Sequence, residues 1–476
     1  MHNNNNIINL HGTFNSMIFY TLLLILAIIP NKVRAEQEDV CLDCVLQKTL
    51  SNGNKIPLVG LGVGNLQKDL LDDVLNSTLH SHNFRLIDTA RQSGNEKEIG
   101  DAIAYYEKDG NGNEDVIHIV TKVWYTYLGY DRTKISVHNT MDDIAGIPNI
   151  RLHILLHWPR CYDDISWMDC EGEETKLVDW VQSAGPAPHL DKENAWKHSW
   201  RALEDLYTEQ KELREKNKHK KKWKKPIIES IGISNFEFDD MEQLVKIARV
   251  MPHIYQGNLW KVVHDPYLMN LLNNNNIHFQ AYNIMNGAVQ RKSEAPNAFS
   301  VLTKLSNEFM SRAKESTSER EHGHRHEHEL SEIHITEAMV IMAWLTQEGI
   351  AIIPRASSTR HQVENSPSSI NSVPQLSNEE KQKVRAAVSA LMKGKDLSIK
   401  VTFQNKSSQK AELHWANART GEEIRVLQEI APGSSKTIDS HPGHEFVAYS
   451  DGKKTSQRFT ITAFYGDEED FAFDEL

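Results

Sequence analysis

Three side chains that can hold or transfer a proton stand at the ends of apolar, strand-like runs of the sequence: Asp88, Lys122 and His157. The stretch around the first, residues 84–96 (FRLIDTARQSGNE), passes from a short strand through a polar turn to a helix that begins at Glu96. A β/α barrel places its chemistry at the C-terminal ends of its strands. The sequence therefore predicts a barrel site built around Asp88.

Strand-like runs alternate with helix-like segments along most of the chain. This alternation indicates parallel pairing through crossovers, and eight such units close into a (β/α)8 barrel. An Asn-Gly turn predicts a hairpin over residues 47–59, before the first unit. An open, doubly wound sheet is the alternative, but no Gly-x-Gly-x-x-Gly motif follows the first run. The predicted strands are residues 58–62, 85–90, 117–124, 152–158, 227–236, 253–259, 278–285 and 349–356.

The sequence pattern changes after a last predicted helix, which ends near residue 392. Short alternating runs follow, separated by turns such as Pro-Gly and Asp-Gly, and they indicate a small all-β sandwich. The predicted fold class is therefore α/β: a (β/α)8 TIM barrel over residues 47–392, followed by a small all-β sandwich domain over residues 397–466.

The two ends of the chain indicate the secretory pathway. An apolar run over residues 16–30, followed by the step VRA, is typical of a signal peptide, residues 1–35, whose removal leaves no stable membrane span. An uncleaved anchor is the alternative, although the run is short for a bilayer, which needs about 20 residues. The acidic tail, residues 467–476, ends in FDEL, similar to the retrieval signal of the endoplasmic reticulum. We therefore expect the protein in the lumen of that compartment.

The net charge limits the classes of partner that we expect, and the cysteines indicate the redox environment. A formal net charge of -12, without a nucleic-acid motif, argues against nucleic acid as a partner. An even number of cysteines after the expected cleavage point favours disulfides: Cys41, Cys44, Cys161 and Cys170. Cys161 and Cys170 would close a short loop. The Cys-x-x-Cys pair stands close to the mature N-terminus, which favours a structural pair over a redox motif.

Three insertions interrupt the alternating pattern. Residues 160–193 are acidic and carry two of the cysteines. Residues 211–225 are basic, which favours a solvent-exposed helix extension over a partner-binding patch. Residues 311–334 interleave histidines with glutamates; a polar loop is the simpler interpretation, and a metal site is the alternative.

Across residues 47–392 the chain resembles the aldo-keto reductase family. The motifs LSNGNKIPLVGLG, LIDTA, GNEKEIG, VTKVW, LLHWP, IGISNF and IIPR occur in the family's order. In that family a nicotinamide delivers hydride to a carbonyl carbon while an acidic side chain protonates the alkoxide. The resemblance implies that Asp88 holds Lys122, that Lys122 lowers the pKa of an acid tyrosine, and that His157 orients the carbonyl oxygen of a small carbonyl or alcohol substrate.

Ser93 stands where the family has that tyrosine: the chain reads SGNE in place of YGNE. A serine hydroxyl has a pKa far above that of a phenol, and the side chain is too short to span the same distance. Tyr125 and Tyr127 follow Lys122 closely, but the family's geometry gives no reason to expect either as a substitute. Ser93 is therefore the argument against ordinary carbonyl reduction.

The cofactor positions of the family are better preserved and imply binding of NADP(H). An arginine stands where the family pairs a lysine with the 2′-phosphate, and an arginine can do so bidentately. The matching positions are Ser234, Asn235 and Gln256 for the carboxamide, Tyr282 for the nicotinamide ring, Arg355 for the 2′-phosphate, and Glu364 and Asn365 for adenine.

Residues 397–466 resemble the β domain of the von Hippel–Lindau tumour suppressor family, in the stretch VTFQNKSSQKAELHWANARTGEEIRVLQEIAPGSSKTIDSHPGHEF. The hydroxyproline pocket of that family uses a tryptophan, a serine and a histidine, which match Trp415, Ser440 and His444. Its tyrosine is absent here. The resemblance implies a protein or peptide partner, and a purely structural role for these residues is the alternative.

Two functions follow, and the sequence leaves both open. The first is an NADP(H)-dependent oxidoreductase of the aldo-keto reductase type. The second is a catalytically inactive barrel, a scaffold or a cofactor sensor, joined to a protein-binding sandwich that recognises hydroxyproline.

Overall fold

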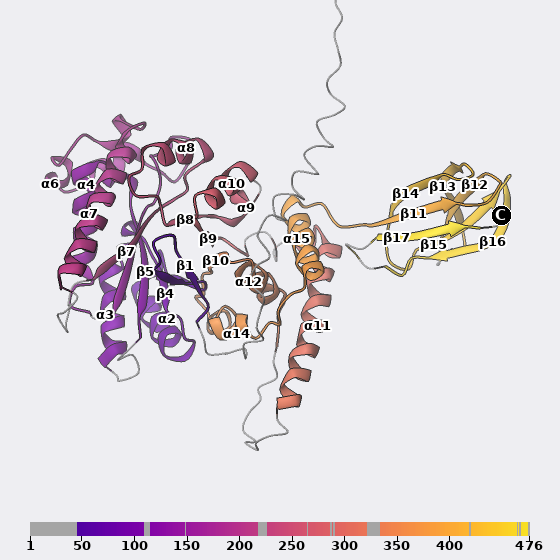
Figure 1. Cartoon of the computed structure of the whole chain (residues 1–476), viewed down its shortest axis with the longest axis horizontal. Coiled ribbons are helices and arrows are strands. Elements are labelled where there is room, and N and C mark those ends of the chain that lie inside the picture. The colour runs from indigo at the N-terminus through magenta and orange to yellow at the C-terminus, as the bar shows by residue number, and fades with distance from the viewer. Residues whose placement is uncertain are drawn as a thin grey trace, which may run out of the picture. The chain divides into compact units, whose positions relative to one another are not determined.

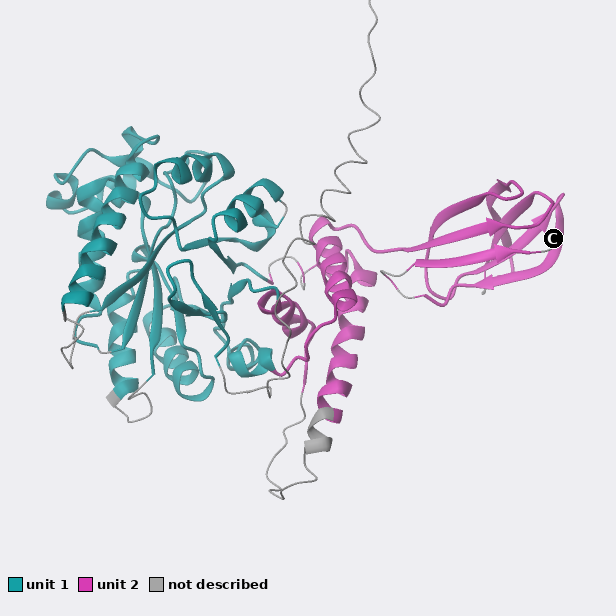
Figure 2. Cartoon of the chain, in the orientation of Figure 1, with its two compact units in different colours: residues 1–284, 348–371 teal, residues 285–347, 372–476 magenta. Residues whose placement is uncertain are grey.

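A computed structural model describes residues 45–108, 115–147, 149–217, 226–263, 265–285, 288, 291–320, 334–417, 420–463, 465 and 468–474 (Figure 1). Several predicted features lie outside these residues: the signal peptide, Cys41 and Cys44, most of the basic and histidine-rich insertions, and the last two residues of FDEL. The chain divides into two compact units, residues 1–284 with 348–371, and residues 285–347 with 372–476 (Figure 2). Within the described ranges, no helix has the length and apolar character needed to span a membrane.

Eight parallel strands form a nearly closed barrel in the first unit, so the predicted fold class is confirmed. Neighbouring strands pair in chain order, and the isolated bridges Val59–Ile352 and Gly62–Arg355 join the first strand to the last. The strands are β3 (Leu61–Gly62), β4 (Leu86–Asp88), β5 (Ile117–Val123), β6 (Ile150–Leu156), β7 (Ile227–Ser234), β8 (Ile254–Asn258), β9 (His278–Tyr282) and β10 (Ala351–Ile353).

The predicted hairpin precedes the barrel as β1 (Gln47–Thr49) and β2 (Lys55–Pro57), which pair antiparallel. Gly53 supplies the positive φ of its turn, at 85°. Leu50 and Ile56 of the hairpin belong to one buried cluster with side chains from five barrel strands. The hairpin therefore fills one end of the barrel with apolar side chains and leaves the other end for the site.

Amphipathic helices cover the barrel strands. In α2 (Lys68–Ser81) the buried residues Leu71, Val74, Leu75 and Leu79 recur at helical spacing and form one apolar stripe. The other longer helices of this unit are α3 (Glu96–Lys108), α4 (Tyr130–Asp143), α7 (Ala195–Asn217), α8 (Phe238–Ile247) and α10 (Pro266–Asn274). Shorter ones are η1 (Arg91–Ser93), η2 (Tyr125–Tyr127), α5 (Cys170–Thr175), α6 (Asp179–Gln182), η3 (Pro188–Leu190), α9 (Leu259–Val262), α13 (Thr359–Glu364) and α14 (Pro367–Asn371).

The second unit contains α11 (Pro296–Arg320), α12 (Glu337–Gln347), α15 (Asn378–Lys393) and two β-sheets. Ser377 and Glu380 form a capping box at the start of α15, and Gly394 ends it with a φ of 59°. The first sheet has the order β14 (Ser435–Ser440), β11 (Ile399–Asn405), β17 (Glu468–Phe473). The second has the order β13 (Glu423–Ile430), β12 (Ala411–Ala416), β15 (Glu445–Ser450), β16 (Lys453–Thr460).

The prediction that residues 467–476 form an acidic tail was wrong in one respect, because Glu468–Phe473 form strand β17. This strand pairs in parallel with β11, from Lys400–Glu468 to Asn405–Phe473. Phe471 and Phe473, on either side of Ala472, share one face of the strand, and their ring centroids lie 5.6 and 6.1 Å from that of Phe403. Phe473 is buried and Phe471 partly buried, and this apolar packing outweighs the acidic composition on which the tail prediction rested.

Candidate active site

Asp88 and Lys122 form a buried ion pair at the C-terminal ends of two adjacent strands. Asp88 ends β4, and Lys122 is the second-last residue of β5. Lys122 Nζ lies 2.8 and 3.0 Å from the two carboxylate oxygens and 2.7 Å from Thr89 O. The side chains are 4% and 13% exposed for Lys122 and Asp88. All three ammonium protons thus have acceptors, which fixes a positive charge at this place.

A glutamine pair extends from this carboxylate across the barrel. Gln256 Nε2 donates to Asp88 Oδ1 at 2.6 Å and to Gln280 Oε1 at 2.7 Å. Gln280 is fully buried, and its Nε2 has no hydrogen-bond partner among the described residues. The prediction included Gln256 but missed Gln280, although a glutamine inside an otherwise apolar run was a signal that could have found it.

His157 follows β6 directly and holds a neutral imidazole. Burial, and then the charge of Lys122, keep the pKa of His157 well below its usual range. Its Nδ1 is buried, and no described residue accepts or donates a hydrogen bond there. The ring stands edge-on to Trp124, with centroids 4.9 Å apart. A neutral imidazole can donate one hydrogen bond to a carbonyl oxygen but is no source of a readily released proton.

Three residues predicted to hold a cofactor meet at the ends of β7 and β9. Asn235 Nδ2 donates to His157 O at 3.0 Å and to Ser234 Oγ at 3.1 Å. The phenol of Tyr282 donates to Asn235 Oδ1 at 2.6 Å, and burial raises the pKa of that phenol to about 12. Asn235 has a φ of 60°, a conformation that asparagine tolerates better than most residues. Its backbone N–H donates to Gln256 O at 3.2 Å, which joins this group to the glutamine pair.

The remaining predicted cofactor residues lie beyond β10. Arg355 is exposed, and no carboxylate in the described part of the chain pairs with its guanidinium. Asn365 Nδ2 donates to Arg355 O at 3.4 Å, and Glu364 is the last residue of α13, whose N-cap is Ser358. The structure thus places Arg355, Glu364 and Asn365 on one short segment after the last barrel strand.

The sequence profile of the Aldo/keto reductase family matches residues 58–389. The chain belongs to the aldo/keto reductase family. It is 25% identical over 328 residues to the NAD(P)H-dependent D-xylose reductase of Kluyveromyces lactis, across 67% of this chain and 85% of that protein. Over 320 residues it is 25% identical to the NADPH-dependent aldose reductase GRE3 of Saccharomyces cerevisiae, across 65% and 84%. A solved aldo-keto reductase of Bombyx mori in complex with NADP is 20% identical, with a TM-score of 0.49, across 74% of this chain and 93% of that one.

In this aldo/keto reductase Ser93 ends η1, immediately after β4. Its side chain is partly exposed, and its backbone N–H donates to Ala90 O at 2.9 Å. A Cβ placed on Gly64 would lie 3.3 Å from Ser93 Oγ, so the hydroxyl faces the loop that follows β3. The hydroxyl is therefore on the same side of the barrel as Asp88.

Tyr125, one of the two tyrosines that follow Lys122, lies in surroundings that oppose release of its phenolic proton. The residue is buried on η2, and burial, followed by Glu173, raises the pKa of its phenol far above the usual range. A proton-donating phenol in this family requires the opposite shift. This upward shift of the pKa argues against Tyr125 as a substitute for the tyrosine that the resemblance implies.

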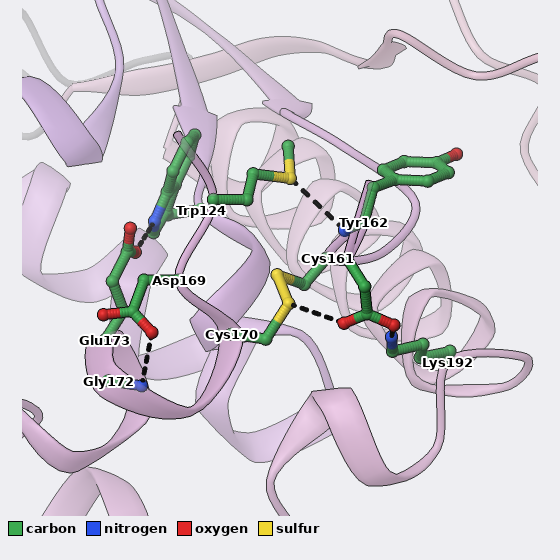
Figure 3. The surroundings of a disulfide bond; sticks show 10 residues. Trp124, Cys161, Tyr162, Asp169, Cys170, Gly172, Glu173 and Lys192 are labelled. Carbon is green, nitrogen blue, oxygen red and sulfur yellow. Dashed lines mark hydrogen bonds and ion pairs between the residues drawn. A yellow bond between two sulfur atoms is a disulfide. The ribbon is translucent and has the colours of Figure 1, made fainter. Parts of the chain in front are cut away.

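The acidic insertion after β6 of this aldo/keto reductase contains α5, α6, η3 and the expected disulfide (Figure 3). Cys161 and Cys170 are bonded, with their Cα atoms 5.8 Å apart. Glu173, on α5, accepts a hydrogen bond from Trp124 Nε1 at 2.6 Å. This contact could not be predicted, because neither spacing nor composition indicates which acidic residue of the insertion reaches the barrel.

The residues predicted to bind a peptide come together in the second unit. Ser440 Oγ lies 3.2 Å from His444 Nδ1, and the rings of Trp415 and His444 lie 5.4 Å apart. Burial, and then the neighbouring His441, lower the pKa of His444. Ser440 is buried, whereas the two rings are partly exposed. The likeness of this domain to the von Hippel–Lindau β domain stays a prediction from the sequence.

Proposed function

We propose that the barrel is an NADP(H)-dependent oxidoreductase that acts on small carbonyl or alcohol compounds without a phenolic acid. The observation that carries this proposal is one continuous set of hydrogen bonds. Side chains join Lys122, Asp88 and Gln256, and the backbone carbonyl of Gln256 accepts from the backbone N–H of Asn235. The side chain of Asn235 then accepts from Tyr282 and donates to the backbone carbonyl of His157. The names of the xylose and aldose reductase relatives, which mention NAD(P)H or NADPH, support the choice of cofactor.

The side chains present fit this cofactor. Arg355 offers an exposed guanidinium without an ion pair among the described residues, the group best suited to a phosphate. Tyr282 offers an aromatic ring, and Ser234 offers a hydroxyl proton next to the Asn235 amide. The unpartnered Nε2 of Gln280 is a further buried donor at this end of the barrel. Bound NADPH would supply a hydride to the carbonyl carbon of the substrate.

The protein's own groups would then act on the carbonyl oxygen. Neutral His157 donates a hydrogen bond to it, and the fixed charge of Lys122 stabilises the negative charge that develops there. Since His157 gives up no proton readily and Ser93 is a poor acid, the alkoxide takes its proton from water that enters beside the partly exposed Ser93. We therefore expect slow turnover.

An inactive barrel that senses the cofactor is the second candidate, and Ser93 favours it. Both candidates require binding of the cofactor, which quenching of tryptophan fluorescence by NADPH tests. Absence of binding at millimolar NADPH would exclude both. Turnover of an aldehyde panel by the wild-type protein then separates them. Measurable turnover supports the reductase, whereas a rate gained only by Ser93→Tyr supports the inactive barrel.

For the sandwich we propose binding of a hydroxyproline-containing peptide, supported by the contact between Ser440 and His444 beside Trp415. Pulldowns with prolyl-hydroxylated and unmodified peptides test it, using His444→Ala. His414→Ala is the matched control, because His414 stacks on Tyr449 with centroids 3.9 Å apart and not on Trp415. Equal retention on hydroxylated and unmodified peptides, or unchanged retention of the His444→Ala variant, would rule out this pocket.

We also propose that the protein resides in an oxidising compartment, the lumen of the endoplasmic reticulum, and the Cys161–Cys170 disulfide supports this. Alkylation and mass spectrometry of protein isolated from cells would detect both residues as free thiols if the proposal is wrong.

A further inference from the structure

Two indole rings lie next to the imidazole of the candidate active site, and a third indole packs against both of them. Trp124 stands edge-on to His157, and Trp158 follows His157 in the chain with ring centroids 6.4 Å apart. Trp167, from the acidic insertion, lies 6.3 Å from Trp124 and 5.8 Å from Trp158, centroid to centroid. Yet Trp167 is 56% exposed. Trp167 thus presents an exposed indole ring that packs against two other indole rings beside His157 of the candidate active site. Such a ring is a candidate contact for a substrate.

A covalent ring holds Trp167 in this position. The disulfide between Cys161 and Cys170 (Figure 3) closes residues 161–170 into a loop. Trp167 belongs to this loop. Inside the loop Tyr162 N donates to Met168 Sδ at 3.3 Å, and Met168 is only 8% exposed. The loop therefore has its own interior packing, and the position of Trp167 is constrained on both sides.

Two carboxylates of α5 attach this loop to the barrel. α5 begins at Cys170, and Asp169 caps it by accepting from Gly172 N at 2.9 Å. Glu173 accepts from Trp124 Nε1 at 2.6 Å, as Figure 3 shows. Glu174 binds the fully buried Arg132 through two hydrogen bonds of 2.9 Å. The disulfide-closed loop is thus fixed to β5 through Glu173 and to α4 through Glu174.

These contacts also decide the chemistry of the surface beside His157. The single polar atom of the Trp124 side chain is taken by Glu173, so its remaining ring surface is apolar. Indole faces attract flat, apolar rings, and they offer no partners for the hydroxyl groups of a sugar chain. We propose that the disulfide-closed loop 161–170 is a wall of the substrate site, and that Trp167 is a specificity-determining residue that selects flat, apolar carbonyl compounds. The inference rests on the proposed reductase function.

Two measurements test it, one of binding and one of turnover. The first is the affinity of 2-naphthoate, a flat acid that cannot be reduced by hydride, measured by calorimetry in the presence of NADPH. The second is the ratio of kcat/KM for 2-naphthaldehyde to kcat/KM for D-xylose. The variants are Trp167→Ala, Trp167→Phe and the double substitution Cys161→Ser with Cys170→Ser. Trp180→Ala is the matched control, because Trp180 lies on α6 of the same insertion and is also 56% exposed.

We expect Trp167→Ala and the double serine variant each to weaken naphthoate binding and to lower the turnover ratio by roughly tenfold, the upper range for aromatic contacts. Trp167→Phe should restore most of the loss, and Trp180→Ala should change neither value. Failure of the wild-type protein to bind naphthoate, or equal losses in Trp167→Ala and Trp180→Ala, would overturn the inference.

The two proposals fail in different ways. If naphthoate binds in a Trp167-dependent manner but the wild-type protein reduces no aldehyde, the proposed reductase function is wrong and the proposed wall stands. If the Trp167→Ala variant reduces aldehydes with the same preference as the wild-type protein, the proposed wall is wrong and the proposed reductase function stands.

Discussion

Gln256 donates a hydrogen bond to Oδ1 of Asp88 at 2.6 Å, and Lys122 contacts the same oxygen at 2.8 Å. One carboxylate oxygen therefore accepts hydrogen bonds from a lysine and a glutamine for which the family resemblance predicts different roles. Because both donors are buried, loss of either would leave the Asp88 carboxylate with one hydrogen bond fewer.

Ser93→Tyr should raise the rate of aldehyde reduction by about a hundredfold, because a general acid typically contributes about that much or more. Ser93→Phe is the control, since it adds the ring without the hydroxyl. The measurement is the oxidation of NADPH with a fixed aldehyde at saturating cofactor. Equal rates for the tyrosine and phenylalanine variants would show that the ring, and not a proton donor, is what the site lacks.

Removing one member of the Asp88–Lys122 pair should cost more stability than removing both. Lys122→Met leaves a buried carboxylate with Gln256 as its remaining side-chain donor, and Asp88→Asn leaves a buried ammonium; either loss costs about 3–5 kcal/mol. The double variant, which leaves no unpaired buried charge, should be destabilised by less than either single variant and therefore by less than their sum. Urea titrations followed by tryptophan fluorescence measure this coupling. Strict additivity would mean that the two charges do not stabilise each other.

Stability of the barrel should fall as the pH drops below about 6.5, the ordinary histidine pKa. Burial lowers the pKa to about 3 for His118 and His278 and to about 4 for His253, and it holds those of His153 and His157 well below their usual range. Between pH 6.5 and about 4 the unfolded chain therefore binds protons that the folded barrel does not, so the free energy of unfolding decreases with falling pH.

His278→Gln tests this pH dependence at one position. It should reduce the slope of the free energy of unfolding between pH 6.5 and 4.5 by about 1.4 kcal/mol per pH unit, the value for one proton. His361→Gln, at an exposed position on α13, should leave the slope unchanged. Thermal and urea unfolding over this pH range provide the comparison. An unaltered slope for His278→Gln would mean that His278 is protonated in the folded barrel.

Arg355→Ala should weaken NADPH binding by roughly ten- to a hundredfold while leaving NADH binding nearly unchanged, because only the former carries the 2′-phosphate. Arg360→Ala is the matched control, since Arg360 is also exposed and lies five residues further on, in α13. Fluorescence quenching with each cofactor measures the effect. An equal loss for NADH would assign Arg355 to another part of the cofactor.

The barrel could be predicted because its strands are short apolar runs, several of which end at or next to a polar side chain such as Asp88, Lys122 or His157. Asp88 and Lys122 were found this way, and their 2.8 Å contact follows from the adjacency of β4 and β5. Gln280 was missed although it pairs in register with Gln256 on the adjacent strand β8. The partner of Glu173 could not be assigned, because Glu173 lies in an insertion that has no strand register with the barrel. The β17 strand was missed because its acidic composition obscured the alternation of Phe471 and Phe473.

The barrel closes between a first strand of 2 residues and a last strand of 3. Few backbone hydrogen bonds cross this junction: Gly60 N to Ile352 O at 2.9 Å, Ile352 N to Leu58 O at 2.8 Å and Gly62 N to Pro354 O at 3.0 Å. Arg355 pairs with Gly62 at the same junction. Binding of a phosphate at Arg355 would therefore be linked thermodynamically to closure of the barrel. Amide hydrogen exchange at Gly60, Gly62 and Ile352 would slow on addition of NADPH, which makes the least-paired edge of the sheet a reporter of occupancy.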